Sequence, residues 1–272
     1  MNVAATAHAR DLEVDGYAWR ERGTGELVVL LHGLGGSRVA WDAQLASLSI
    51  QWRAAAWDMP GYGSAAPLPD QPLTFRALAD AAAGWISALG VDRAHVVGTS
   101  MGGMVALYVA AWHPERVRSL TLLSSSPKFG MDGTSAQSWR TARLAPLDAG
   151  WQPIEFAERV LRGIAGPNIT EAAFESQRAA MARVTGSALR RSIDCLVTHD
   201  ATGLLSTITA PTLVMVGELD QETPLAYSQY LVDHLPNARL AVVPDAGHLL
   251  NAEAPEPVNR LLAEHLTAVE AS

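Results

Sequence analysis

The sequence is short of cysteine, of basic runs and of long apolar stretches. Its 272 residues include one cysteine, Cys195, which cannot form an internal disulfide, so the fold does not depend on an oxidising compartment. The net charge is −8 and no run of lysine or arginine occurs, which argues against nucleic acid or an anionic membrane surface as the main partner. No stretch approaches the ~18 consecutive apolar residues of a membrane span.

The first 13 residues lack the features of a secretion signal. They are rich in alanine, but His8, Arg10 and Asp11 interrupt them, and no apolar core of about 7–15 residues forms. We therefore expect no signal peptide and a cytoplasmic location. A hydrophobic content of 49% with 18% charged residues is typical of a globular protein, and the length suffices for one large α/β domain.

The most informative stretch is a serine with a glycine two residues away on each side, Gly98, Ser100 and Gly102. The apolar, partly β-branched run 94–97 before it predicts a buried strand, and the run 104–112 after it has helical spacing. A serine between a strand end and a helix start is typical of the G-x-S-x-G nucleophile elbow. In that turn the serine exposes its hydroxyl, while neighbouring backbone passes too close for side chains at the two glycines.

Short apolar runs and amphipathic segments alternate through most of the chain. Residues 10–22, around Asp15-Gly16, predict an antiparallel hairpin at a sheet edge. Further strands are predicted at 27–31, 53–57, 94–97, 119–123, 211–216 and 239–243. Helices are predicted at 41–50, 74–89, 104–112, 224–235 and 257–269. This alternation predicts a mostly parallel sheet with helices on both faces.

One long segment breaks the alternation. Residues 126–206 contain no strand-like run, and Gly and Pro divide them into amphipathic segments. The helices predicted there are 135–145, 153–163, 170–184 and 186–196. We predict a core of residues 1–125 and 207–272 with a helical cap of residues 126–206.

A serine nucleophile needs a base to take its proton and an acid to orient the base. In this fold the acid precedes the histidine, and both follow the serine. Asp220 comes directly after the strand 212–216 and His248 directly after the strand 239–243, so both lie at the carboxyl edge of the sheet. Glu218 and Asp245 are alternative acids in the same loops. We predict Ser100, His248 and Asp220 as the catalytic residues.

Two backbone N–H groups should stabilise the negative charge that develops on the substrate. Met101 follows the nucleophile, and Leu34 lies in the glycine-rich turn 32–36 after the first central strand. We predict that these two residues supply the oxyanion hole. A phosphate-binding loop is disfavoured because no G-x-x-x-x-G-K-[ST] or G-x-G-x-x-G follows that strand.

These motifs together resemble the α/β-hydrolase superfamily. The resemblance rests on His32-Gly33, Asp58-Met59-Pro60-Gly61-Tyr62-Gly63, Gly98-Thr99-Ser100-Met101-Gly102-Gly103, Gly217-Glu218-Leu219-Asp220 and Gly247-His248. Within the superfamily the core is similar to bacterial enol-lactonases and small carboxylesterases. The resemblance implies a β-sheet core with a helical cap, a Ser-His-Asp triad and no cofactor. Ser100 stands where haloalkane dehalogenases and epoxide hydrolases carry aspartate. No H-E-x-x-H motif or paired Cys/His cluster suggests a metal site.

The predicted reaction is hydrolysis of a small carboxylic ester or lactone through an acyl-enzyme on Ser100. The cap should supply specificity, with Arg140 and Arg143 as candidates to bind a substrate carboxylate or to form a solvated helix face. Candidate pocket residues, each of which could equally serve packing, are Phe129, Met131, Trp139, Leu144, Trp151 and His199.

Several alternatives remain open at this stage. A carbon–carbon bond hydrolase of ring-cleavage products uses the same triad, although it usually has a longer glycine-rich oxyanion loop than residues 32–36. Perhydrolysis is a further reaction of the same acyl-enzyme. A non-catalytic receptor could bind a small ligand in the same pocket. The sequence indicates neither the substrate nor the oligomeric state.

Overall fold

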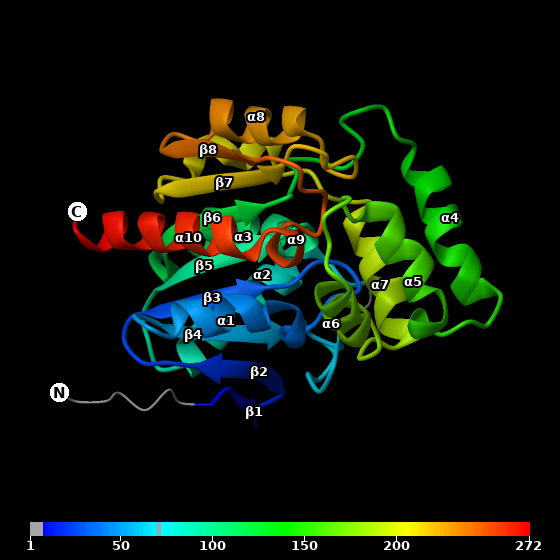
Figure 1. Cartoon of the computed structure of the whole chain (residues 1–272), viewed down its shortest axis with the longest axis horizontal. Coiled ribbons are helices and arrows are strands. Elements are labelled where there is room, and N and C mark those ends of the chain that lie inside the picture. Colours follow the sequence, from blue (N-terminus) through cyan, green and yellow to red (C-terminus); the bar gives the residue numbers. More distant parts are fainter. Residues whose placement is uncertain (1–7, 70–71) are drawn as a thin grey trace.

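A computed structural model describes residues 8–69 and 72–272, so residues 1–7 of the stretch considered for a signal peptide lie outside the described part. Within the described residues, eight strands form one sheet in the order β1-β2-β4-β3-β5-β6-β7-β8 (Figure 1). The strands are β1 (Arg10–Val14), β2 (Tyr17–Arg22), β3 (Leu27–Leu31), β4 (Arg53–Asp58), β5 (Ala94–Thr99), β6 (Val117–Leu123), β7 (Thr212–Gly217) and β8 (Ala238–Val243).

The sheet is antiparallel at one edge and parallel elsewhere. β1 and β2 form the predicted hairpin, and β2 pairs antiparallel with β4. All remaining neighbours are parallel, so the carboxyl ends of β3 to β8 meet at one edge of the sheet. The mostly parallel sheet predicted from the sequence is confirmed.

Helices cover both faces of the sheet because each central strand is apolar on both sides. In β3, Leu27, Val29 and Leu31 face the cluster that contains helices α2, α3 and α8, whereas Val28 and Leu30 face α1 and α10. The bounds are α1 (Asp42–Leu48), α2 (Phe75–Ala88), α3 (Met101–Trp112), α8 (Leu225–His234), α9 (Leu250–Glu253) and α10 (Pro255–Glu270). The 3-10 helices are η1 (Arg38–Trp41), η2 (Pro114–Arg116) and η3 (Thr202–Thr207).

The segment between β6 and β7 forms a helical layer at the carboxyl ends of the strands (Figure 1). Its helices, here called the cap helices, are α4 (Ala136–Asp148), α5 (Pro153–Ile164), α6 (Glu171–Met181) and α7 (Gly186–Leu196). They begin where the sequence provides caps; for example, the hydroxyl of Thr185 accepts a hydrogen bond from the N–H of Ala188. The exact division into a core of 1–125 and 207–272 and a cap of 126–206 stays a prediction.

The chain enters and leaves the cap helices along one short two-stranded contact. The N–H of Phe129 donates to the carbonyl of His199, and the N–H of Ala201 donates to that of Pro127. An ion pair of 2.8 Å between Lys128 Nζ and Asp200 Oδ2 lies in the same contact. The two connections to the core are therefore held side by side.

No helix within the described part of the chain is long and apolar enough to cross a membrane.

Candidate active site

Ser100 lies in a strained turn between β5 and α3. Its backbone has φ 51° and ψ −122°, a conformation that is costly for any residue with a Cβ atom. A Cβ atom on Gly98 would overlap the carbonyl of Gly102, and one on Gly102 would overlap the carbonyl of Leu31. The glycine spacing in the sequence therefore reflects backbone segments in direct contact around the serine.

The neighbouring strand holds this turn in place. The N–H of Ser100 donates to the carbonyl of Leu123 at the end of β6, at 2.9 Å. The hydroxyl of Ser125 donates to the carbonyl of Ser100 at 3.0 Å. Because the backbone of Ser100 is bonded on both sides, its side chain is held at the carboxyl edge of the sheet.

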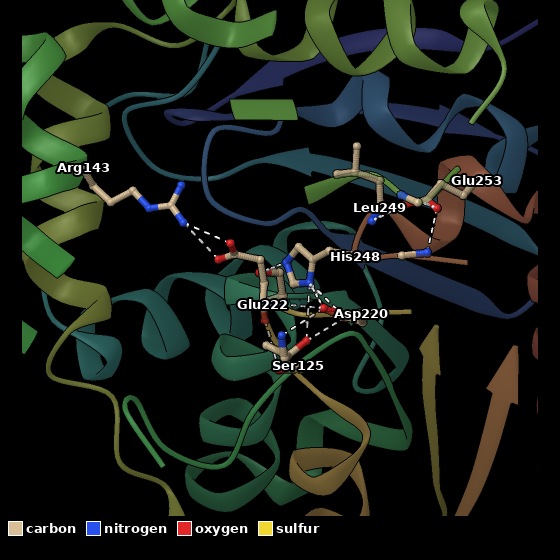
Figure 2. Close-up of polar contacts among 11 residues, drawn as sticks. Ser125, Arg143, Asp220, Glu222, His248, Leu249 and Glu253 are labelled. Carbon is tan, nitrogen blue, oxygen red and sulfur yellow. Dashed lines mark hydrogen bonds and ion pairs between the residues drawn. The ribbon is translucent and has the colours of Figure 1, made fainter. Parts of the chain in front are cut away.

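His248 lies between Ser100 and Asp220, and Figure 2 shows Asp220 beside it. Its Nε2 is 3.0 Å from the Oγ of Ser100, and its Nδ1 is 3.0 Å from each carboxylate oxygen of Asp220. A carboxylate only accepts, so Nδ1 carries the proton and Nε2 accepts from the serine hydroxyl. Both His248 and Asp220 are buried. The chain Ser100–His248–Asp220 is the arrangement that converts a serine into a nucleophile.

The loop after β7 fixes the carboxylate of Asp220. The N–H groups of Glu222 and Thr223 donate to Oδ1 at 3.0 and 2.9 Å, and the Thr223 hydroxyl donates to Oδ2 at 2.9 Å. Burial alone would raise the pKa of Asp220 and lower that of His248. Their mutual attraction and hydrogen bond, together with the Thr223 bonds to Asp220 and the charges of Glu222 and Glu253 near His248, outweigh burial, so the pKa of Asp220 is lowered and that of His248 is raised.

The turn after β3 lies against the side chain of Ser100. A Cβ atom on Gly33 would be 3.6 Å from the Oγ of Ser100, so the backbone around Gly33 and Leu34 borders the reacting oxygen. Met101 begins α3, and an N–H in the first turn of a helix has no acceptor within that helix. Leu34 and Met101 are thus on the two segments that border Ser100, which keeps them as the proposed oxyanion donors.

His32 fixes the shape of the turn that contains Leu34. Its Nδ1–H donates to the carbonyl of Gly33 at 2.8 Å, and its Nε2 accepts from the N–H of Met59 at 2.9 Å. Complete burial lowers the pKa of His32, although the Gly33 carbonyl opposes this effect. The ring is therefore neutral and joins the turn after β3 to the loop after β4.

The predicted pocket residues occupy different environments. The rings of Phe129 and Trp139 pack edge to face with centroids 5.3 Å apart, and Leu144 is buried in the same large cluster. Trp151, at the connection between α4 and α5, is 46% exposed. His199 is buried, with one ring nitrogen bonded to the Tyr108 hydroxyl and the other to the carbonyl of Ser126, and burial lowers its pKa to about 4. These bonds occupy both ring nitrogens of His199.

Both cap arginines considered for a substrate carboxylate already have carboxylate partners. Arg140 pairs with Asp194 of α7 at 2.6 Å. Arg143 contacts both oxygens of Glu222 at 3.0 and 3.1 Å, and Figure 2 shows this pair reaching from α4 to the loop that carries Asp220. Arg143 therefore joins a cap helix to the segment that orients His248.

Two carboxylates near the site, Glu253 and Asp58, have structural roles that the sequence does not indicate, although Asp58 belongs to a motif named above. The carboxylate of Glu253 accepts backbone hydrogen bonds from both neighbours of His248. Asp58 accepts from the N–H of Arg38 at 2.9 Å and from the guanidinium of Arg183, beyond α6, at 3.1 Å. The position of Asp58 at the end of a predicted strand was a usable signal. Arg183 lies 125 residues from Asp58, and Gly166, a third donor to Glu253, lies 87 residues from it, so no local pattern indicates these two partners.

Titratable side chains elsewhere in the site do not form a metal-binding cluster. Across residues 8–69 and 72–272, no group of three or more His, Cys, Asp or Glu side chains is arranged to hold a metal ion.

Comparison with known proteins gives the family. The family model described as "alpha/beta hydrolase fold" matches residues 26–255, and the chain belongs to this family. A pimeloyl-[acyl-carrier protein] methyl ester esterase from Neisseria meningitidis serogroup C is 34% identical, over 84% of this chain and 89% of the relative. Together with the fold, this similarity makes the chain an ester-cleaving hydrolase.

Solved structures agree with this assignment. An esterase from Thermogutta terrifontis, solved with malate bound, superposes with a TM-score of 0.84 at 26% identity and covers 97% of this chain and 99% of its own. A protein described as an N-acyl homoserine lactone degrading enzyme superposes with a TM-score of 0.78 at 27% identity, covering 94% of this chain and 99% of its own.

Proposed function

We propose that this protein hydrolyses a small carboxylic ester or lactone through an acyl-enzyme on Ser100, with His248 as base and Asp220 as the acid that orients it. The observation that carries the proposal is the unbroken contact from Asp220 through His248 to Ser100, with 3.0 Å at each step. A serine hydroxyl at neutral pH is a weak nucleophile unless such a base is within hydrogen-bond reach.

In the first half of the reaction, the Oγ of Ser100 attacks the acyl carbon while its proton moves to Nε2 of His248. The N–H groups of Leu34 and Met101 stabilise the oxyanion, each contributing about 3–4 kcal/mol. The intermediate collapses, and the leaving alkoxide takes the proton from His248. With a lactone substrate, the alcohol formed in this way remains covalently attached to the acyl group.

In the second half, His248 takes a proton from water and the resulting hydroxide attacks the acyl carbon. The second tetrahedral intermediate collapses, His248 returns its proton to the Oγ of Ser100, and the carboxylic acid is released. Asp220 stays ionised throughout, because its lowered pKa favours the carboxylate, and it stabilises the imidazolium in both halves.

The substrate class rests on this mechanism and on the relatives. One relative is named for the methyl ester of an acyl-carrier-protein conjugate, and one structural neighbour is described as degrading a lactone. Both substrates offer an ester carbonyl carbon and an alkoxide leaving group, which fits the acyl transfer proposed for Ser100. The cap helices would select among such substrates, and we propose Phe129, Trp139 and Leu144 as part of the pocket wall.

The test compares wild type with Ser100→Ala on a fluorophosphonate probe and on a panel of short esters, lactones and ring-cleavage dienoates. We expect the probe to label wild type only, and the variant to lose roughly a millionfold in kcat on its best ester. Ser206→Ala, which alters an exposed serine on η3, is the matched control and should behave as wild type.

Each other outcome identifies a different function. Turnover confined to the dienoates would indicate a carbon–carbon bond hydrolase. A folded wild type that neither reacts with the probe nor turns over any substrate would indicate a receptor that binds a small ligand. Esterase activity that survives in Ser100→Ala would refute the role of Ser100.

A further inference from the structure

The carboxylate of Glu253 is bonded to the backbone around the proposed base. Glu253 is the last residue of α9 and lies five residues after His248. Its Oε2 accepts from the N–H of Gly247 at 2.7 Å, and its Oε1 accepts from the N–H of Leu249 at 2.8 Å. These two donors directly flank His248, and Figure 2 shows Glu253 beside one of them, Leu249. The side chain of Glu253 thus binds the backbone on both sides of His248.

The same carboxylate is bonded to the cap helices. Its Oε2 also accepts from the N–H of Gly166, two residues beyond the end of α5, at 2.9 Å. In the same contact, the N–H of His248 donates to the carbonyl of Ile164 at 3.1 Å. Every backbone N–H from Gly247 to Leu249 is therefore bonded either to Glu253 or to the end of α5.

Two glycines make this contact sterically possible. A Cβ atom on Gly166 would overlap the carboxylate of Glu253 and the N of Gly247, and one on Gly247 would overlap the N of Gly166. The backbone at the end of α5 and the backbone before His248 therefore meet directly. The loop therefore cannot move closer to the end of α5.

The bonds to Glu253 join an ionised acceptor to neutral donors, which makes them stronger than hydrogen bonds between neutral groups. All three donors are backbone N–H groups, so the carboxylate fixes the path of the chain rather than the identity of a neighbouring side chain. If the carboxylate were removed, three partly buried donors would lose their acceptor, and the segment would move to satisfy them.

We propose that Glu253 is a positioning residue, which holds the backbone of His248 in register with Ser100 and couples it to the end of cap helix α5. This inference rests on the proposed role of His248 as base. Proton transfer requires the two atoms, Nε2 and Oγ, to stay near their 3.0 Å separation, and a shift of about 1 Å in such a contact costs on the order of 100-fold in rate. Glu253 touches neither the substrate nor the reacting atoms.

Glu253 also acts on His248 through its charge. The charged groups that raise the pKa of His248 are Asp220 and Glu222 from the loop after β7 and Glu253 from α9. His248 must be neutral to accept the proton of Ser100. Removing the charge of Glu253 lowers the pKa of His248, so the neutral form persists to lower pH and the acid limb of kcat/KM moves to lower pH.

The experiment measures kcat, KM and the pH profile for wild type, Glu253→Gln, Glu253→Asp and Glu256→Gln. Glu256 is exposed on α10, three residues away, so Glu256→Gln makes the same charge change without these bonds. For Glu253→Gln we expect kcat to fall by about 10- to 100-fold with little change in KM, together with an acid limb at lower pH. Glu253→Asp keeps the charge but shortens the side chain, so its kcat should fall while its acid limb stays at the wild-type pH.

Ser100→Ala separates the two proposals. If that variant keeps its activity, the proposed function fails, whatever the Glu253 variants show. If Ser100→Ala is inactive but Glu253→Gln matches Glu256→Gln in both kcat and acid limb, the positioning role is overturned. Should Glu253→Gln fail to fold, Glu253→Asp decides the question, since a wild-type kcat in that variant contradicts the inference.

Discussion

Replacing Asp220 with asparagine tests the orientation of the base. The carboxylate of Asp220 accepts from the N–H groups of Glu222 and Thr223, from the Thr223 hydroxyl and from Nδ1–H of His248. An amide has only one accepting oxygen. If that oxygen stays on the two backbone donors, the NH₂ group faces Nδ1 of His248 and donates to it. The imidazole then carries its proton on Nε2 and cannot accept the proton of Ser100.

The magnitude follows from this change of tautomer. The variant keeps the backbone bonds that shape the loop, so the position of His248 should change little while its function as a base is lost. Such a loss costs about 10⁴-fold in kcat, which corresponds to about 5 kcal/mol of transition-state stabilisation. Substrate binding does not use this proton, so KM should change much less than kcat.

The assay is hydrolysis of a p-nitrophenyl ester at neutral pH, combined with the rate of labelling by a fluorophosphonate. Asp245→Asn is the control, because Asp245 is an exposed acid in the loop of His248 and asparagine tolerates its φ of 56°. We expect that control to retain wild-type kcat. An Asp220→Asn variant within tenfold of wild type would refute the reasoning, and a large loss in Asp245→Asn would assign the acid to Asp245.

Two further predictions concern stability. The free energy of unfolding of Ser100→Gly should exceed that of Ser100→Ala by about 1 kcal/mol, because glycine relieves the strain at φ 51° and both variants lack the hydroxyl. Ser100→Gly should therefore have the higher urea midpoint, and equal midpoints would argue against stored strain. His199 is neutral in the fold with a pKa of about 4, below the ordinary 6.5, so its contribution is complete above pH 6.5 and is lost as pH falls towards 4. Glutamine at this position can keep both bonds but does not titrate. His199→Gln should therefore lose less unfolding free energy than wild type between pH 6.5 and pH 4, by up to roughly 3 kcal/mol. An unfolding free energy that falls with pH as steeply as in wild type, measured by urea titration, would contradict this prediction.

Local sequence signals were sufficient for the elements of the fold and for the residue at the elbow. The strand β3 is a continuous apolar run because both its faces are covered, and β4 to β7 are mostly buried, a pattern that depends only on neighbouring residues. The elbow is largely local, since the strain at Ser100 and the close approach of Gly98 to Gly102 arise within five residues, whereas the approach of Gly102 to Leu31 depends on the neighbouring strand. The order of acid and histidine after the serine placed Asp220 and His248 at the same edge of the sheet.

Only the tertiary structure decided which side chains meet. The loop after β7 offers both Glu218 and Asp220, and the path of that loop brings Asp220 to Nδ1 of His248. The contacts of Glu253 join residues 166, 247 and 249, and that of Arg143 joins α4 to residue 222. Such contacts depend on how elements pack across tens of residues, where sequence periodicity carries no distance information. The sequence by itself therefore determined the strand–helix order and the nucleophile turn, whereas packing decided how the cap helices, acid and base are joined.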